Sequence, residues 1–398
     1  MADNKNNNER NVPPLRFPEF TEEWKEEQLD NIATLSKGIG ISKEQLSEDG
    51  EPCILYGELY TKYKSEIIKQ VESKTDINGS KLKRSKANDV IIPCSGETAV
   101  DIATARCVPF DNILFGGDLN VISLHQYDGA FMSYQLNGKR KYDIARVAQG
   151  VSIVHLYGEH LKAIKTYNPT LPEQQKIAKL LSLLDDRIDT QNKIIEKYES
   201  LIKGLNNILL YGTEGKYVCL GDILLERLER SRTNNQHEVL SSTVKGIFSQ
   251  REYFSKDIAS ENNVGYKIIR LHDVVLSPQN LWMGNINYND RFDIGIVSPS
   301  YKVFSIADGY DNQFVAAMLK TYRALYSYMM VSEQGASIVR RNLNMEAFLQ
   351  LVFKIPSLDK QRETGYAISL LKYQLKTANK IIRAYISQKK YLLRQMFI

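Results

Sequence analysis

Residues 169–210 read P-T-L-P-E-Q-Q-K-I-A-K-L-L-S-L-L-D-D-R-I-D-T-Q-N-K-I-I-E-K-Y-E-S-L-I-K-G-L-N-N-I-L-L. Mostly apolar side chains recur from Ile177 to Leu209 in alternating steps of four and three, with Gln191 at one of these positions. This is the a/d spacing of a coiled coil, and charged residues such as Asp185 and Arg187 occupy the other positions. A helix of roughly 40 residues measures about 60 Å. Because so long a helix needs a packing partner, the stretch predicts one half of a helix pair.

The C-terminal segment, residues 356–398, repeats this stretch at an offset of 187 positions, as Pro169 and Pro356 show. Its apolar residues occupy the same heptad positions, which favours a seam between the two helices over two amphipathic helices that each pack on their own domain. The predicted seam contains Ile177, Leu181, Leu184, Ile188, Ile195 and Tyr198 from the first helix, and Ile368, Leu371, Leu375, Ile382 and Tyr385 from the second.

The two remaining intervals are weaker copies of each other. Short apolar runs such as 89–94 and 119–124 are bounded by turn residues and predict strands, whereas 127–136 predicts a helix. The segments 216–223, 273–279 and 310–319 repeat 24–32, 89–95 and 127–136, and Q-G-x-S-I-V occurs at 149–154 and 334–339. The predicted fold is α+β, with two pseudo-repeated globular domains joined by the long helices. The predicted segments are a disordered tail (1–14), domain 1 (15–168), a central helix (169–215), domain 2 (216–355) and a C-terminal helix (356–398).

Composition restricts the class of protein. The net charge of +5 permits nucleic-acid binding without requiring it. The four cysteines are scattered, which indicates buried thiols in a reducing compartment and no zinc site. The polar start is not a signal peptide, and no apolar run is long enough to span a membrane. A cytoplasmic location without membrane contact is expected.

Motifs for catalysis are missing from the sequence. There is no G-x-x-x-x-G-K-[ST] loop for phosphates, and Gly38 and Gly40 form a lone G-x-G. No Asn-Pro-Pro-aromatic segment is present to grip a flipped base, so a freestanding methyltransferase is disfavoured. His155 and His160 are five residues apart, which suits neither a metal pair nor one helix face. We therefore expect a binding protein with no catalytic residue, metal site or cofactor of its own.

Basic and amide side chains gather in both globular intervals. Clustered Lys and Arg beside Ser, Asn and Gln suit phosphate contact together with the reading of base edges, although each cluster alone could be a solvated basic surface. The predicted DNA-binding residues are Lys81, Lys83, Arg84, Lys86, Ser95, Lys139, Arg140 and Lys141 in the first interval, and Arg227, Arg230, Arg232, Gln279, Asn280, Arg340 and Arg341 in the second.

These features together resemble the DNA-specificity subunit of type I restriction-modification systems. The resemblance rests on L-R-F-P-E-F-x-x-x-W at 15–24, the two Q-G-x-S-I-V segments, P-x-L-x-x-Q at the start of each long helix, and the C-terminal L-L-R-Q-M-F. The second helix opens with P-S-L-D-K-Q-R, without the acidic P-E-Q-Q found at 172–175.

The resemblance implies two target-recognition domains on two antiparallel helices, which read the halves of a bipartite, asymmetric DNA site. It also implies two methyltransferase subunits, which use S-adenosylmethionine to methylate adenine N6, and motor-nuclease subunits, which use ATP and Mg. These cofactors would belong to the partner subunits. The alternative, from another class, is a coiled-coil adaptor whose globules bind proteins and not DNA.

Overall fold

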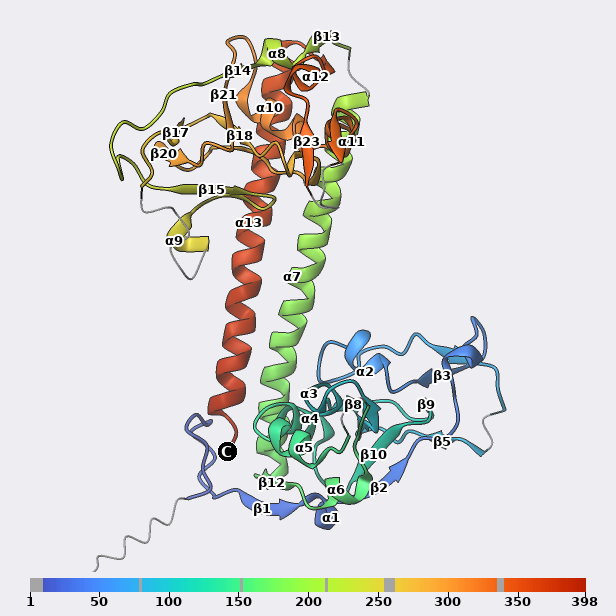
Figure 1. The fold of residues 1–398 in the computed structure, drawn as a ribbon. Helices are drawn as coiled ribbons and strands as arrows, with labels where there is room; N and C mark the ends of the chain where they lie inside the picture. Colours follow the sequence, from blue (N-terminus) through green and yellow to red (C-terminus); the bar gives the residue numbers. More distant parts are fainter. Residues whose placement is uncertain (1–9, 79–80, 151–152, 212–213, 254–261, 335–339) are drawn as a thin grey trace, which may run out of the picture. The chain divides into compact units, whose positions relative to one another are not determined.

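The chain divides into two compact units. The computed structural model describes residues 10–78, 81–150, 153–211, 214–253, 262–334 and 340–398. Unit 1 comprises Met1–Asn192 with Lys380–Ile398, and unit 2 comprises Lys193–Asn379. The two long helices are α7 (Leu171–Tyr211) and α13 (Leu358–Gln395), and each passes from one unit into the other (Figure 1). The sequence-based segments treat each helix as a separate piece, whereas each unit contains part of both helices.

Unit 1 is built on an antiparallel sheet of four strands in the order β2-β10-β6-β8. These strands are β2 (Ala33–Lys37), β10 (Leu119–Leu124), β6 (Asp89–Pro93) and β8 (Arg106–Val108). A second sheet has the order β4-β3-β9-β5, from β4 (Lys74–Thr75), β3 (Glu51–Ile54), β9 (Leu114–Phe115) and β5 (Lys83–Arg84). Two pairs complete the strands, β1 (Lys25–Gln28) with β12 (Lys165–Asn168), and β7 (Ser95–Gly96) with β11 (Val154–His155). The helices are α1 (Leu29–Ile32), α2 (Glu58–Thr61), α3 (Ala99–Ile102), α4 (Gly129–Asn137), α5 (Lys141–Val147) and α6 (Gly158–Lys162), and η1 (Lys43–Gln45) is a 3-10 turn.

Strand β6 is buried on both faces, because α4 packs on one face of the sheet and the second sheet packs on the other. Val90 and Ile92 pack into a core with α4, while Ile91 packs on the other face with Ile54 and Phe115 of the second sheet. Alternate residues of a strand point to opposite faces, so a continuous apolar run is what a strand buried on both sides requires. This explains why 89–94 lacks the alternation of a half-exposed strand.

Unit 2 repeats this arrangement. Its four-stranded sheet has the order β14-β21-β18-β19, and each strand is the counterpart of the strand in the same place in unit 1. These strands are β14 (Leu224–Glu226), β21 (Lys302–Ile306), β18 (Val274–Leu276) and β19 (Ile286–Tyr288). The strand pairs are β13 (Lys216–Cys219) with β24 (Val352–Ile355), β15 (Leu240–Thr243) with β16 (Gly246–Ser249), β17 (Lys267–Arg270) with β20 (Ile294–Val297), and β22 (Ser332–Gln334) with β23 (Arg341–Leu343). The helices are α8 (Leu220–Ile223), α9 (Gln250–Tyr253), α10 (Asn312–Met318), α11 (Tyr322–Met330) and α12 (Met345–Leu349), with a 3-10 turn η3 (Leu281–Met283).

The internal repeat extends to individual hydrogen bonds. In unit 1, Gln174 Oε1 accepts from the backbone N–H of Asp128, and Gln174 Nε2 donates to the carbonyl of Pro169. In unit 2, Gln361 makes the same two bonds, with Asp311 and Pro356. Asp128 and Asp311 are themselves the N-caps of α4 and α10. The glutamine of each P-x-L-x-x-Q motif therefore ties the start of a long helix to a helix of its globule.

Within unit 1, α7 and α13 run antiparallel. Lys389 of α13 contacts Asp185 of α7 at 2.5 Å, and Met396, close to the end of α13, packs with Ile177 near the start of α7. Glu66 also contacts Lys389 at 2.5 Å, so two carboxylates share one ammonium group. Lys389 lies at an a/d position of the heptad pattern, four residues after Tyr385. Its polar contact therefore takes the place of an apolar contact in the seam.

Within unit 2, the other halves of the same helices meet. Leu205 of α7 packs with Ile368 of α13 and Ala317 of α10. All the predicted seam residues are removed from solvent to some degree. Ile177, Leu181, Leu184, Ile368 and Ile382 are buried, and Ile188, Ile195, Tyr198, Leu371, Leu375 and Tyr385 are half-buried.

The predicted α+β fold with a repeated globule is confirmed, and the strands predicted at 89–94 and 119–124 and the helix predicted near 127–136 are present. Parts of the two Q-G-x-S-I-V segments, residues 151–152 and 335–339, lie outside the described residues. Among the described helices, none is both long and apolar enough to cross a membrane.

Candidate nucleic-acid interface

Several residues that were predicted to contact DNA from unit 1 bond to the protein itself. The guanidinium of Arg84 holds both carboxylate oxygens of Glu51, at 2.6 and 3.0 Å. Ser95 is buried and donates to Asp118 Oδ2 at 3.2 Å. Ser95 is therefore held inside the protein, whereas the Arg84–Glu51 ion pair lies at the surface, with 35% and 46% of the two side chains exposed.

The cluster at 139–141 is divided in the same way. Arg140 Nη2 donates to the carbonyl of Ile398 at 2.7 Å, and its guanidinium lies 5.2 Å from the centre of the Tyr167 ring. Burial lowers the pKa of Lys141, and the neighbouring Arg106 adds to the shift. Arg140 thus attaches the last residue of the chain to unit 1, which is a structural role. Lys139 remains exposed.

Unit 2 shows the same division between bonded and exposed residues. Arg227 makes a two-pronged bond to buried Asp273 at 2.9 and 3.0 Å. Arg341 donates to the side chain and the carbonyl of Ser332 at 3.0 and 2.7 Å, and so joins β22 to β23. Arg230 is exposed and donates to the carbonyl of Gly265 at 2.9 Å.

The other predicted residues lie at the surface. Lys83 is half-buried, and the exposed ones are Lys81, Lys86, Lys139, Arg232, Gln279 and Arg340. Lysine and arginine side chains at such positions can meet phosphates without first breaking a bond within the protein. The sequence could not separate these two groups, because the partners of the bonded arginines are remote in the chain. Glu51 is 33 residues from Arg84, and Ile398 is 258 residues from Arg140.

A polar pocket in unit 2 contains two of the predicted residues. Its volume is about 410 Å³. Gln279 and Asn280 line it together with Ser242, Thr243, Val244, Lys245, Ser277, Asn285, Ser300 and Tyr301. Asn280 Oδ1 is buried and has no hydrogen-bond partner among the described residues. Amide side chains can bond to adenine through two atoms at once, and lysine can bond to guanine, so the lining suits contact with base edges.

Most of this lining was missed by the sequence reasoning. Asn285 accepts from Ser242 Oγ at 2.8 Å, and Asn287 donates to the same oxygen at 2.7 Å. Tyr301 donates to the carbonyl of Ser242 at 3.0 Å. The alternation of Asn with apolar residues at 285–289 was the available signal, because it places several amides on one face of a short strand.

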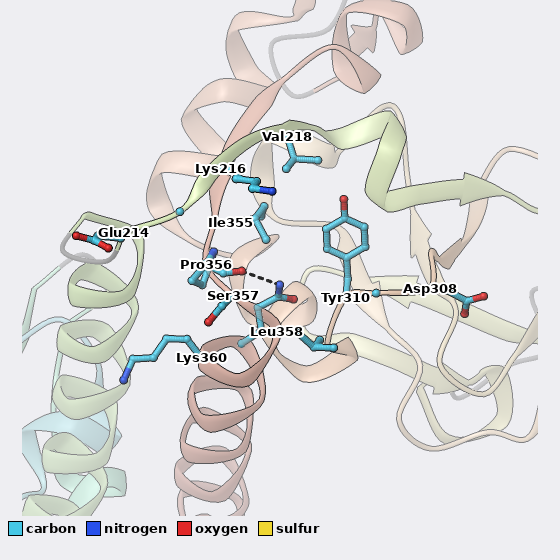
Figure 2. Close-up of a pocket in the computed structure, with 13 residues that line it drawn as sticks. Glu214, Lys216, Val218, Asp308, Tyr310, Ile355, Pro356, Ser357, Leu358 and Lys360 are labelled. Carbon is cyan, nitrogen blue, oxygen red and sulfur yellow. Dashed lines mark hydrogen bonds between the residues drawn. The ribbon is translucent and has the colours of Figure 1, made fainter.

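A larger pocket of about 880 Å³ lies in unit 2 where α13 begins (Figure 2). Apolar residues such as Val218, Ile355 and Leu358 form part of its lining, and Lys216, Tyr310 and Lys360 contribute polar groups. Its chemistry differs from the first pocket, since it is lined by the helix start and β13 and contains few amide side chains.

The described residues contain no group of three or more His, Cys, Asp or Glu side chains that could hold a metal ion. Burial raises the pKa of Cys53 and Cys94 to about 11 and that of Cys107 to about 12. These thiols are protonated at neutral pH, whereas metal ligation and nucleophilic attack require the thiolate.

Comparison with known proteins identifies the class of fold. Residues 21–200 match the family model described as "Type I restriction modification DNA specificity domain". The chain is similar to the S subunit of a type I restriction-modification system from M. genitalium, with 16% identity, a TM-score of 0.63, and coverage of 97% of this chain and 99% of that chain. It is also similar to a chain from a structure on complex assembly and conformational transition of the type I R-M system, with 12% identity, a TM-score of 0.51, and coverage of 96% and 99%.

Proposed function

We propose that this chain is a DNA-reading specificity subunit, because residues 21–200 match the family model of the type I restriction modification DNA specificity domain and the chain is similar in fold to type I S subunits. Each unit would read one half of a bipartite, asymmetric site. The duplicated sheet order and the repeated Gln174 and Gln361 contacts support one reading surface in each unit. The observation that carries the proposal is the match over residues 21–200, combined with this duplication.

The partners follow from the same proposal. Two methyltransferase subunits would dock on the chain and use S-adenosylmethionine to methylate adenine N6. Motor-nuclease subunits with ATP and Mg would complete a restriction enzyme. This chain would supply recognition and no catalytic group, and the two long helices would set the spacer between the half-sites.

The polar pocket of unit 2 that Gln279 and Asn280 line is the part of the chain that we propose reads base edges. Gln279 is exposed at its rim, and Asn280 has an unpartnered oxygen within it. Loss of one base contact costs about 1–3 kcal/mol and relaxes the sequence requirement at one position. We therefore expect Gln279→Ala to relax one base of one half-site and to leave the other half-site unchanged.

The test is methylome sequencing of cells that carry the variant with its methyltransferase subunits. Gln350→Ala is the control, because Gln350 is an exposed amide of unit 2 that does not line the pocket. Relaxation of bases in both half-sites would contradict one reading surface per unit.

The salt dependence of DNA affinity distinguishes the proposed DNA-binding function from the adaptor alternative. Each phosphate contact made by Lys or Arg lowers the slope of log K against log salt by about 0.9. We expect duplex binding by the complex to weaken steeply between low and moderate salt. An affinity for duplex DNA that does not change with salt would favour the adaptor.

A further inference from the structure

The chain covers the start of one long helix with its own N-terminal segment. In unit 1, the guanidinium of Arg16 holds both oxygens of Glu173, each at 2.7 Å. Trp24 Nε1 also donates to Glu173. One turn further along α7, Lys176 bonds to Glu19 and lies 4.6 Å from the centre of the Phe17 ring. The segment R-F-P-E-F at 16–20 is therefore bound by two oppositely charged residues of α7, Glu173 and Lys176, which are three residues apart.

The equivalent place in unit 2 is an open pocket. The offset of 187 that relates the two helices places Lys360 at the position of Glu173, and the Gln361–Pro356 bond has the same geometry as the Gln174–Pro169 bond. Lys360, Tyr310 and Val218 line the pocket of about 880 Å³. Figure 2 shows the pocket between the beginning of α13 and the strand that contains Lys216 and Val218.

The two charges that hold the segment in unit 1 are exchanged in unit 2. Lys360 replaces Glu173, and Glu363 replaces Lys176. Lys360 and Glu363 bond to each other at 2.7 Å, and their side chains are 46% and 71% exposed. In unit 1, the counterpart of Lys360, Glu173, is 1% exposed, and the counterpart of Glu363, Lys176, is 47% exposed. The corresponding pair in unit 2 thus has the opposite order of charge, and its first member, Lys360, is exposed where Glu173 is buried.

This exchange decides which segment can occupy the pocket. The N-terminal segment of a second copy would bring Arg16 to Lys360 and Glu19 to Glu363, and both contacts would be repulsive. A matching segment has a carboxylate followed three residues later by a cation, with an aromatic residue between them for the apolar floor. Residues 16–20 of a second copy therefore do not fit the pocket, and we look for the matching segment in a partner protein.

We propose that the pocket at the start of α13 is a docking site for an acid-x-x-base segment with an aromatic residue, supplied by a modification subunit. The identity of the partner rests on the proposed function above, whereas the charge order rests on the two helices. The corresponding place in unit 1 is already filled by residues 16–20. The two modification subunits would therefore bind this chain through non-equivalent contacts.

The test gives α13 the order of charge that α7 has in unit 1. Lys360→Glu combined with Glu363→Lys keeps the net charge and the pair within the helix, but reverses the charge of Lys360, which lines the pocket, and of Glu363, which is its ion-pair partner three residues along α13. The matched control is Asp359→Arg combined with Arg362→Asp, because Asp359 and Arg362 form the neighbouring exposed pair on the same helix and do not line the pocket. Purified modification subunit is titrated into each form of the full chain, and binding is followed by calorimetry and native mass spectrometry.

We expect one of the two binding steps to weaken by at least about tenfold in the Lys360/Glu363 variant, so that complexes with one modification subunit accumulate. The control should bind two subunits as the wild type does. A second variant, Ser357→Trp, fills the pocket without a change in charge and should weaken the same step. Wild-type binding by both pocket variants would overturn the docking site and leave the proposed function intact. Failure of the wild-type chain to bind the modification subunit at all would overturn both.

Discussion

At the scale of single residues, Gly365 of α13 is required by contact and not by backbone conformation. A Cβ at this position would lie 2.3 Å from Asp311 Oδ1 and 2.6 Å from the backbone nitrogen of Phe314, at the cap of α10. Alanine improves helix propensity by about 1 kcal/mol, but overpacking costs about 1–3 kcal/mol. We expect Gly365→Ala to lower the thermal midpoint of unit 2, measured by calorimetry.

Gly204 of α7 provides the matched control for this substitution. It belongs to the same unit and also lies within a long helix, but no described atom comes within 4 Å of a Cβ at this position. Gly204→Ala should therefore raise the stability by up to about 1 kcal/mol. Equal effects of the two substitutions would show that α13 does not press on the cap of α10.

Lys320 gives unit 2 a stability that depends on pH. The Lys320 side chain as a whole is exposed, but its ammonium donates to buried Asn287 at 2.6 Å and is partly desolvated there. This desolvation lowers the pKa of Lys320 to about 8, and Lys372 adds to the shift. Between about pH 8 and the ordinary lysine pKa of about 10.4, the unfolded chain binds more protons than the folded chain. Stability contributed by this group therefore rises with pH across that window and is constant below it.

We expect Lys320→Met to remove this rise, so that the difference in thermal midpoint between variant and wild type changes from pH 8 to pH 10. Taking the difference removes the contribution of every group that titrates in both proteins. A difference that stays constant across the window would show that the ammonium is not desolvated.

Charge patterns in the sequence do not show which basic residues are paired within the protein. Arg84, Arg140 and Arg227, which are predicted to contact DNA, also bond to Glu51, Ile398 and Asp273. An exposed arginine and an arginine paired with a remote carboxylate have the same local sequence. Only the three-dimensional fold distinguishes them, because the pairing partner is set by strand order.

At the scale of elements, the sequence was far more informative. Heptad spacing indicates which face of a helix is buried. The sequence repeat at an offset of 187 residues indicates that the two long helices have equivalent surroundings. It could not report which residues of α7 face which residues of α13, because every heptad position resembles the next. The contact of Lys389 with Asp185 specifies that register within unit 1, and no apolar pattern contains it.

The glutamine that ties each long helix to its globule can be tested as an element junction. Gln361 is buried, and its side chain makes bonds of 3.0 Å to Asp311 and 2.9 Å to Pro356. Removal of the side chain leaves buried backbone groups unpaired, which costs about 1–3 kcal/mol. We expect Gln361→Ala to accelerate amide hydrogen exchange at Asp311 and at the start of α10.

Gln174→Ala is the counterpart of this variant, and should accelerate exchange at Asp128 and the start of α4. Each variant controls for the other, since the two glutamines belong to different units. Accelerated exchange in both units from a single substitution would mean that the two junctions are not independent.

At the scale of the whole molecule, both long helices continue from one unit into the other. If each unit reads one half-site, the length of these helices should set the spacer in the DNA. Four added residues lengthen a helix by about 6 Å and slightly more than one turn, and one base pair spans about 3.4 Å. We predict that four residues inserted after Asn192 and four after Asn379 lengthen the spacer by one or two base pairs.

The bases within each half-site should stay the same, because no residue of either globule is altered. Insertion in α7 alone is the informative contrast, since it displaces the antiparallel contacts on one side of the insertion and should reduce methylation at every spacer length. Methylome sequencing of cells that carry each variant gives both the half-sites and the spacer. Full methylation at the original spacer by the double insertion would show that the helix pair is not the ruler. Altered half-site bases would instead show that the helices and the reading surfaces are mechanically coupled.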